Sequence, residues 1–317
     1  MRDAGIRLAP TTDAMFERYN YFRQHNGGED IADYKSFYRK FSNEREFGGS
    51  FSNLDHLVKL RFCDFFGHVY AAVLRRRPDS VIDVGCGNGA YLPLSNMFPT
   101  VDYHGLDYAE RTAERAQKDY PHATVHVGDA FAMPFEPKRF DMAILSSVLI
   151  LYKERQDQVR LLREVSRVLK DDGVFVLVVW NDCWGLRGAI RLSRLLGSVK
   201  GEQLPEDFMG VHFTEEEIRD RAAAAGLVVQ EHIATSREYG ILEAVRHLNF
   251  AKYNRTFGSA ERESVLQHPQ NVLDDLVQQA GDDSAILTKV LYQASKAFPD
   301  AFPMFSVYVL GKGNGAV

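Results

Sequence analysis

The sequence has 317 residues and a formal net charge of −5, and 45% of its residues are hydrophobic. That length allows one large domain or one core with insertions, and the negative charge argues against a general nucleic-acid coat. Cys63, Cys86 and Cys183 are too few and too scattered for a disulfide framework or a CxxC metal site. With no signal peptide and no apolar run long enough to span a bilayer, we expect a cytoplasmic protein without a transmembrane segment or a bound metal.

The first 76 residues are predicted to form a helical cap. Residues 1–50 are aromatic and charged, and glycines at 27–28 and 48–49 divide them into two short predicted helices. A longer helix is predicted over residues 55–77, and Pro78 ends it. The aromatic residues either pack onto the main domain or form a lid, and we interpret Tyr19 as a lid residue that reaches the ligand site.

Residues 80–92, SVIDVGCGNGAYL, are the most informative stretch. They predict a short buried strand with Asp83 near its end, a glycine turn, and the start of a helix. Gly85, Gly87 and Ala90 also fit the G-x-G-x-x-G/A fingerprint of dinucleotide-binding proteins, which keeps a nicotinamide-dependent oxidoreductase open. A carboxylate at Asp83 would repel a pyrophosphate, however, and would favour a cationic ligand.

This stretch resembles the first motif of class I S-adenosylmethionine-dependent methyltransferases, D/E-x-G-x-G-x-G, at all four defining positions. In that family the acid helps to hold the methionine amino group, and the glycines pass beneath the cofactor. The resemblance therefore implies S-adenosylmethionine as the cofactor. It implies contacts from Asp83, Gly85, Cys86, Gly87, Asn88 and Gly89.

Beyond the glycines, strands and helices alternate as in a doubly wound parallel sheet. Strands are predicted at 101–106 and 123–127, with a helix at 109–119 between them. Asp107 follows the first of these strands, about twenty residues past the glycines, where a ribose-binding carboxylate is expected, with Tyr108 beside it. By the resemblance, Asp129 accepts from the adenine amino group, the N–H of Ala130 reaches the ring, and Phe131 lines the pocket.

The fourth predicted strand, 140–145, leads to Ser146-Ser147-Val148-Leu149, and Ser146 is a further candidate cofactor contact. Methyltransferases that act on DNA-base amines or glutamine amides carry [N/D]-P-P-[Y/F] here, so this sequence disfavours those substrates. A helix is predicted at 154–170, a turn at 171–173 and a buried strand at 173–180. The block 161–180 looks like the corresponding region of ubiquinone- and menaquinone-pathway methyltransferases.

The last third of the sequence contains the features that the family resemblance does not cover. Residues 185–199 predict a basic amphipathic helix, either a lid helix or a membrane-surface contact. Thr214 and Glu217 form a capping box for a helix at 214–225, which Gly226 stops. A strand follows at 227–233. We divide the chain into a cap (1–76), a Rossmann-like core (77–235), a helical insertion for substrate or dimer contacts (236–303), and a closing strand with its tail (304–317).

Together these features predict an α/β fold with a doubly wound, mostly parallel seven-stranded sheet, a helical N-terminal lid and a helical insertion. The predicted activity is methyl transfer to a small molecule at oxygen, with His212 and Tyr152 as candidate catalytic residues. The sequence leaves open nitrogen or carbon acceptors and a tRNA or protein substrate. It also leaves open a cofactor-binding module without enzymatic activity, and a homodimer.

Overall fold

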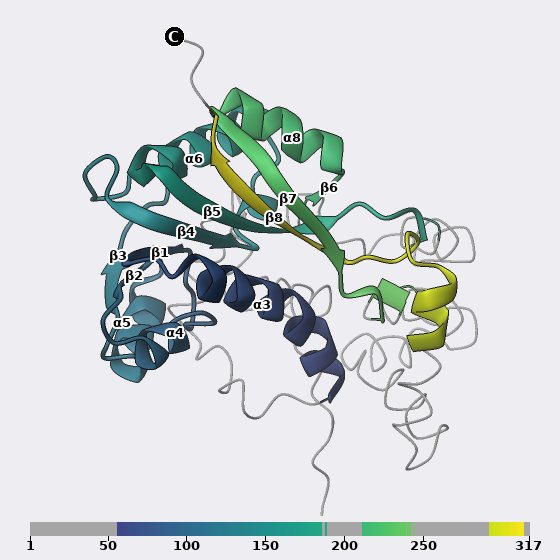
Figure 1. Ribbon diagram of the computed structural model, residues 1–317, viewed down its shortest axis with the longest axis horizontal. Coiled ribbons are helices and arrows are strands. Elements are labelled where there is room, and N and C mark those ends of the chain that lie inside the picture. Colours follow the sequence, from purple (N-terminus) through teal and green to yellow (C-terminus); the bar gives the residue numbers. More distant parts are fainter. Residues whose placement is uncertain are drawn as a thin grey trace, which may run out of the picture.

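A mixed sheet forms the centre of the computed structural model (Figure 1), which describes residues 56–185, 188, 211–238, 240, 241, 244 and 292–313. The sheet has eight strands in the order β3-β2-β1-β4-β5-β8-β7, and β6 pairs with β5 off this path. β8 runs antiparallel to both of its neighbours, β5 and β7, and the other described strand pairs are parallel. The strands are β1 (Ser80–Val84), β2 (Asp102–Asp107), β3 (Thr124–Val127), β4 (Phe140–Ser146), β5 (Leu169–Asn181), β6 (His212–Phe213), β7 (Leu227–Thr235) and β8 (Phe305–Lys312).

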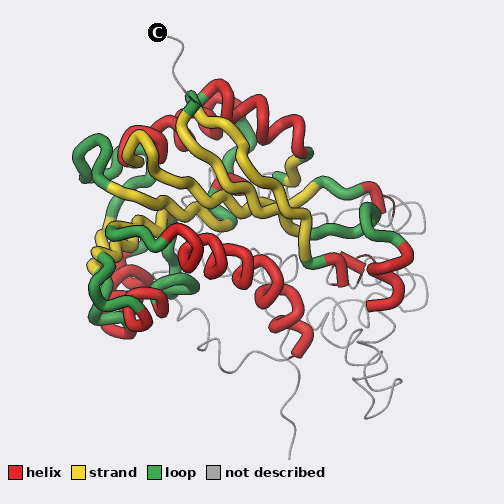
Figure 2. Tube along the Cα trace, in the orientation of Figure 1, coloured by secondary structure: helices red, strands yellow, loops and turns green. Residues whose placement is uncertain are grey.

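Helices cover both faces of this sheet (Figures 1 and 2). One face carries α3 (His56–Arg76), α4 (Pro93–Met97) and α5 (Glu110–Asp119), and the other carries α6 (Arg155–Val168) and α8 (Glu215–Ala224). The buried apolar side chains accordingly form two clusters, one on each side of the sheet. This arrangement confirms the predicted doubly wound α/β fold.

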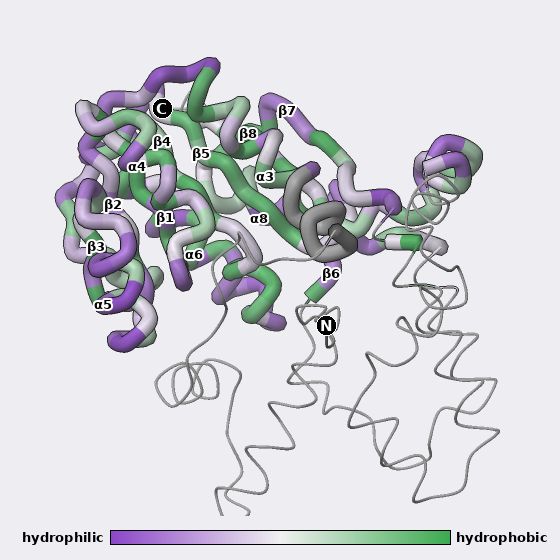
Figure 3. Tube along the Cα trace, turned by 90° about the horizontal axis from the view of Figure 1, so that it is seen from below, coloured by the Kyte–Doolittle hydropathy of each residue, from purple (hydrophilic) through white to green (hydrophobic). Residues whose placement is uncertain are grey.

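The two clusters follow from the alternation of side chains along each strand. In β1, Val81 joins the cluster beneath α3, whereas Ile82 and Val84 join the cluster beneath α6. Asp83 therefore shares its face with Val81. Figure 3 shows β5 as a continuous hydrophobic stretch and α5 as mostly hydrophilic, as expected for a central strand and a surface helix.

The structure corrects the prediction in three places. First, β5 begins at Leu169, so the turn predicted at 171–173 is wrong; Leu169 pairs with Phe140 across an irregularity in the β4–β5 ladder. Second, the glycine turn does not open directly into a helix, because α4 starts only at Pro93. Third, β6 adds a strand to the predicted seven by pairing with the end of β5.

Two predictions from the last third of the sequence are confirmed. Thr214 and Glu217 form the capping box of α8, with both reciprocal bonds present. The closing strand predicted within residues 304–317 appears as β8, inserted antiparallel between β5 and β7.

The domain boundaries at 76, 235 and 303 stay predictions. The α3 helix packs directly on the sheet, where the rings of Phe65 and Phe305 lie 4.6 Å apart. Residues 237, 238, 240, 241, 244 and 292–297 are helical, and all of them lie within the predicted helical insertion. The two short predicted helices of the cap, most of the basic helix, Tyr19 and residues 245–291 of the insertion lie outside the described residues.

Candidate functional site

The candidate site lies beyond the carboxyl ends of β1 and β4, which are neighbours in the sheet. From β1 the chain proceeds outward through β2 and β3, and it then returns to β4 on the other side. In doubly wound sheets, ligands bind in the crevice at such a reversal of strand order. The glycine turn after β1 and the loop after β4 meet there, because a Cβ atom at Gly85 would lie 2.3 Å from Val148 Cγ2.

The glycine turn has a backbone that side chains would obstruct. Gly85, Gly87 and Gly89 all have positive φ, at 73°, 51° and 87°, a region that glycine enters without steric cost. The N–H groups of Gly85 and Cys86 both donate to the Leu106 carbonyl, at 2.6 and 3.0 Å, which joins the turn to β2. Asn88 lies at its exposed tip, whereas Cys86 is buried. The turn therefore presents bare backbone to the crevice.

Asp83 is the most unusual group in the site. Its side chain belongs to a residue only 1% exposed, and Oδ2 has no hydrogen-bond partner among the described residues. Burial, reinforced by the charge of Asp107, raises the pKa of this carboxyl to about 8. Ionising a buried carboxyl costs free energy unless a hydrogen-bond donor or a cation reaches it. The site thus fits a positively charged ligand group.

Asp107 plays a part that the sequence did not reveal. Oδ2 accepts from Gly87 N and Oδ1 accepts from Ala109 N, both at 2.9 Å, so this carboxylate ties the glycine turn to the start of α5. Burial raises its pKa, although these two backbone hydrogen bonds oppose the rise. Each oxygen has a second lone pair. Asp107 can therefore hold the turn and accept hydroxyl donors at the same time.

An aromatic wall follows β3. Asp129 Oδ1 accepts from Phe131 N at 3.0 Å, which fixes the turn that the predicted adenine pocket requires. The ring of Phe131 meets that of Tyr152 edge to face at 4.9 Å, and the Arg160 guanidinium lies 5.1 Å from the Phe131 centroid. Ala130 lies next to Phe131 and is half-buried, as is Tyr108. Phe131 and Tyr152 thus place two apolar rings here, and aromatic rings of this kind can stack on an adenine base.

Hydroxyl groups line the face of the site beneath α3. The Tyr91 hydroxyl donates to Ser146 Oγ at 3.1 Å, which links the glycine turn to the end of β4. The Tyr70 hydroxyl donates to the Ala90 carbonyl at 3.4 Å. These tyrosines were not predicted as site residues, because in the sequence they read as ordinary core aromatics.

The two candidate catalytic residues lie in segments that a backbone hydrogen bond joins. His212 is in β6, its ring 5.3 Å from that of Trp180 at the end of β5. Tyr152 ends the loop after β4, and Val211 N donates to the Ile150 carbonyl of that loop at 2.8 Å. Trp180 Nε1 is buried and has no hydrogen-bond partner in the described part of the chain. Both candidates therefore belong to the edge of the sheet that carries the site.

The described residues contain neither a candidate metal cluster nor a candidate membrane span. No cluster of three or more histidine, cysteine or acidic side chains there could hold a metal ion. None of the helices in the described ranges combines the length and apolarity that crossing a membrane requires.

Comparison with known proteins identifies the segment around this site. Residues 81–173 match the family profile described as "Methyltransferase domain". An uncharacterized protein of Methanocaldococcus jannaschii is 39% identical over 103 residues, which are 32% of this chain and 38% of that protein. The human "Probable tRNA methyltransferase 9B" is 33% identical over 106 residues, which are 33% of this chain and 22% of that protein.

A third relative is also named as a methyltransferase. The "Demethylmenaquinone methyltransferase" of Thermotoga maritima is 32% identical over 111 residues, which are 35% of this chain and 47% of that protein. The chain thus spans less than half of the length of each of these three relatives. The profile match at 81–173 includes the glycine turn, the strand-end acids and the loop after β4. Residues 81–173, which carry most of the candidate site, are therefore similar to methyltransferase domains.

Proposed function

We propose that this protein transfers a methyl group from S-adenosylmethionine to a small-molecule acceptor, at oxygen. The observation that carries the proposal is Asp83, whose buried Oδ2 lacks a partner among the described residues. The ammonium group of S-adenosylmethionine would supply both the missing donor and the opposite charge. The phosphates of a nicotinamide dinucleotide would bring negative charge to the same place, which argues against an oxidoreductase.

The other site residues fit the remaining parts of this cofactor. The glycine turn would lie beneath the methionine portion, Asp107 and Tyr108 would face the ribose, and the wall at Phe131 would face the adenine. The proposed cofactor contacts are Asp83, Gly85, Cys86, Gly87, Asn88, Gly89, Asp107, Tyr108, Asp129, Ala130, Phe131 and Ser146, with Tyr19 from the predicted cap.

When bound, the cofactor supplies an electrophilic methyl group on a sulfonium, and its transfer is an in-line displacement. The protein's task is then to position the acceptor and exclude water. An oxygen acceptor must lose a proton, and we assign that proton to the imidazole of His212. Tyr152, on the neighbouring loop, is the alternative. If the acceptor is a neutral amine or a pre-formed anion, neither residue acts as a base.

The small-molecule acceptor is supported by the loop after β4. It reads Ser146-Ser147-Val148-Leu149 and lacks the Asn/Asp-Pro-Pro motif that holds base and amide nitrogens. A second candidate acceptor is tRNA, favoured by the similarity to proteins named as tRNA methyltransferases. The cytoplasmic location and the homodimer stay predictions.

The proposal is tested in two stages with the full-length protein. Titration calorimetry with S-adenosylhomocysteine and with NAD measures which cofactor binds. Methyl-labelled S-adenosylmethionine is then incubated with the protein and either a low-mass metabolite extract or bulk tRNA, and the labelled product is identified by mass spectrometry.

We expect S-adenosylhomocysteine to bind, NAD not to bind, and label to appear as a methyl ether or ester in the low-mass fraction. Label in nuclease-sensitive material would favour the tRNA candidate instead. Binding of NAD in place of S-adenosylhomocysteine would refute the cofactor assignment. Replacing His212 by glutamine should slow transfer and leave the affinity for S-adenosylhomocysteine unchanged, if the imidazole acts only on the acceptor.

A further inference from the structure

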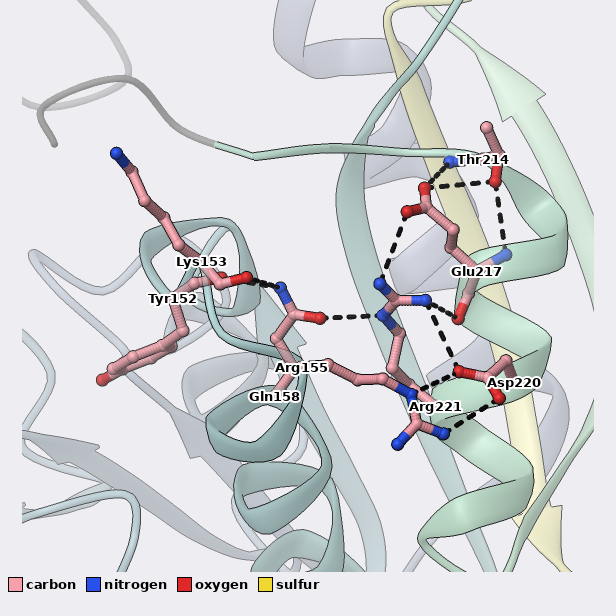
Figure 4. Close-up of polar contacts among 8 residues, drawn as sticks. All are labelled: Tyr152, Lys153, Arg155, Gln158, Thr214, Glu217, Asp220 and Arg221. Atoms are coloured by element: carbon pink, nitrogen blue, oxygen red, sulfur yellow. Dashed lines mark hydrogen bonds and ion pairs between the residues drawn. The ribbon is translucent and has the colours of Figure 1, made fainter. Parts of the chain in front are cut away.

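A buried amide on α6 holds the loop that closes the site. Gln158 is 0% exposed, although its side chain is polar. Its Nε2 donates to the Tyr152 carbonyl at 2.7 Å and to the Lys153 carbonyl at 3.3 Å. Its Oε1 accepts from Arg221 Nε at 2.8 Å (Figure 4). Both amide hydrogens and the carbonyl oxygen are thus in use, so the side chain cannot turn without breaking bonds.

Arg221 on α8 fixes this amide from the other side. Its side chain is 14% exposed. Besides Gln158, it donates to the Glu217 carbonyl at 3.1 Å and packs its guanidinium 5.9 Å from the Phe213 ring. Glu217 is itself held by the capping box with Thr214. The chain of contacts therefore runs from the start of α8, through Arg221 and Gln158, to the backbone just before α6.

The loop that receives these hydrogen bonds contacts both halves of the proposed cofactor site. At its start, Val148 fills the space beside Gly85. At its end, the Tyr152 ring points away from Gln158 (Figure 4). This ring packs edge to face on Phe131. Within it, Ser147 has φ of 59°, a strained value for a residue with a side chain. A strained loop keeps one conformation only when its surroundings hold it.

We propose that Gln158 and Arg221 are positioning residues for the cofactor site, acting through the backbone of Tyr152. The inference rests on the proposed function, because it assumes that the Phe131–Tyr152 wall faces the adenosine portion of the cofactor. Neither residue contacts the ligand. Their effect is to keep the Tyr152 ring against Phe131, so that the wall exists before the ligand arrives and binding does not have to order it.

The structure also provides a matched control. Arg155 and Asp220 join the same two helices by a bidentate ion pair, at 2.8 and 2.9 Å (Figure 4). Their side chains are 54% and 48% exposed. Asp220 Oδ2 also lies 3.6 Å from Arg221 Nη1, but the Arg155–Asp220 ion pair does not include the loop carbonyls. Replacing Arg155 by alanine therefore perturbs the α6–α8 contact and leaves the Gln158 bonds in place.

The test measures affinities by calorimetry on the full-length protein, with S-adenosylhomocysteine and with 5′-methylthioadenosine, which lacks the amino-acid portion. We expect Gln158→Leu to lower the affinity for both ligands by about tenfold, which is the effect of losing a hydrogen bond to a buried carbonyl. Arg221→Met should weaken both by a smaller factor, because Gln158 remains. The double variant should bind no more weakly than Gln158→Leu, since the two residues act in series. Arg155→Ala should stay within about twofold of the parent.

The outcomes separate this inference from the proposed function. If the parent protein does not bind S-adenosylhomocysteine, the proposed function fails. Circular dichroism checks that Gln158→Leu and Arg221→Met are folded. If both folded variants bind S-adenosylhomocysteine as tightly as the parent does, the positioning role is refuted. Should Gln158→Leu not fold, Arg221→Met alone decides, because it leaves the buried amide in place. An equal loss in Arg155→Ala would also refute the inference, since it would trace the effect to helix contact in general.

Discussion

Replacing Asp83 by asparagine should make the protein more stable and, at the same time, less able to bind its cofactor. The substitution keeps the shape of the side chain and removes its ionisation. Asp83 has a pKa of about 8 in the folded protein against an ordinary value of 3.8, chiefly because it is buried. Between these two values the folded protein keeps a proton that the unfolded chain has released.

The magnitude follows from that difference in proton binding. The free energy of unfolding contributed by Asp83 is highest below about pH 4, falls by about 1.4 kcal/mol per pH unit, and levels off above about pH 8. At pH 7 the accumulated loss is about 4 kcal/mol. The Asp83→Asn variant has no carboxyl to ionise, so it does not lose this stability. At pH 7 its free energy of unfolding should exceed that of the parent by up to about 4 kcal/mol. Near pH 4 the two proteins should be equally stable.

Cofactor binding should change in the opposite direction. An ammonium group favours the ionised carboxylate, so binding to the parent at pH 7 should release a proton. Calorimetry with S-adenosylhomocysteine in phosphate and in Tris detects this release as a difference in apparent enthalpy. Asparagine cannot supply the negative charge. We therefore expect the affinity of the Asp83→Asn variant for S-adenosylhomocysteine to fall by roughly 100-fold or more, as when one partner of a buried charge pair is removed.

Urea unfolding at pH 4, 5.5, 7 and 8.5 measures the stability half of this prediction. Asp79, an exposed residue just before β1, provides the control, and Asp79→Asn should stay within about 0.5 kcal/mol of the parent at each pH. A difference between the Asp83→Asn variant and its parent that does not grow from pH 4 to pH 7 would refute the argument from burial. Unchanged affinity for S-adenosylhomocysteine would refute the role of Asp83 in holding the ammonium.

Two further predictions concern stability alone. Gly85→Ala should lower the free energy of unfolding by about 3 kcal/mol, because φ is 73° and the new Cβ would meet Val148. At Gly87 nothing lies within 4 Å of the new Cβ, so Gly87→Ala should lower it by only about 1 kcal/mol. Equal costs in urea unfolding would contradict this ranking. Thr214→Ala removes the acceptor for Glu217 N and should cost about 1 kcal/mol; a variant as stable as the parent would show that the capping box contributes nothing.

Some features of the site could be predicted because they depend on residues close together in the chain. The alternation of Gly85, Gly87 and Gly89 requires a turn that only glycines form easily, and all three have positive φ. The capping box joins residues three apart, Thr214 and Glu217. Local steric and hydrogen-bonding rules are enough in such cases, and the predicted and observed structures agree.

Other features depended on parts of the chain that only the fold brings together. The start of β5 at Leu169 is set by its pairing with Phe140, which outweighs the turn that the sequence suggests at 171–173. Arg221 and Gln158 are 63 positions apart, and neither has a sequence signature, because an arginine and a glutamine on surface helices look like ordinary polar residues.

Residues close together in the chain were enough to predict the kind of domain and the proposed cofactor site, because a strand, an acid and a glycine turn together favour a cationic ligand. The tertiary structure decided how that site is held. It buried Asp83 where none of the described residues donates to Oδ2, and it turned Asp107 back onto Gly87. The physical reason is that burial and desolvation depend on every element packed around a group, whereas turn and capping preferences depend only on its neighbours in the chain.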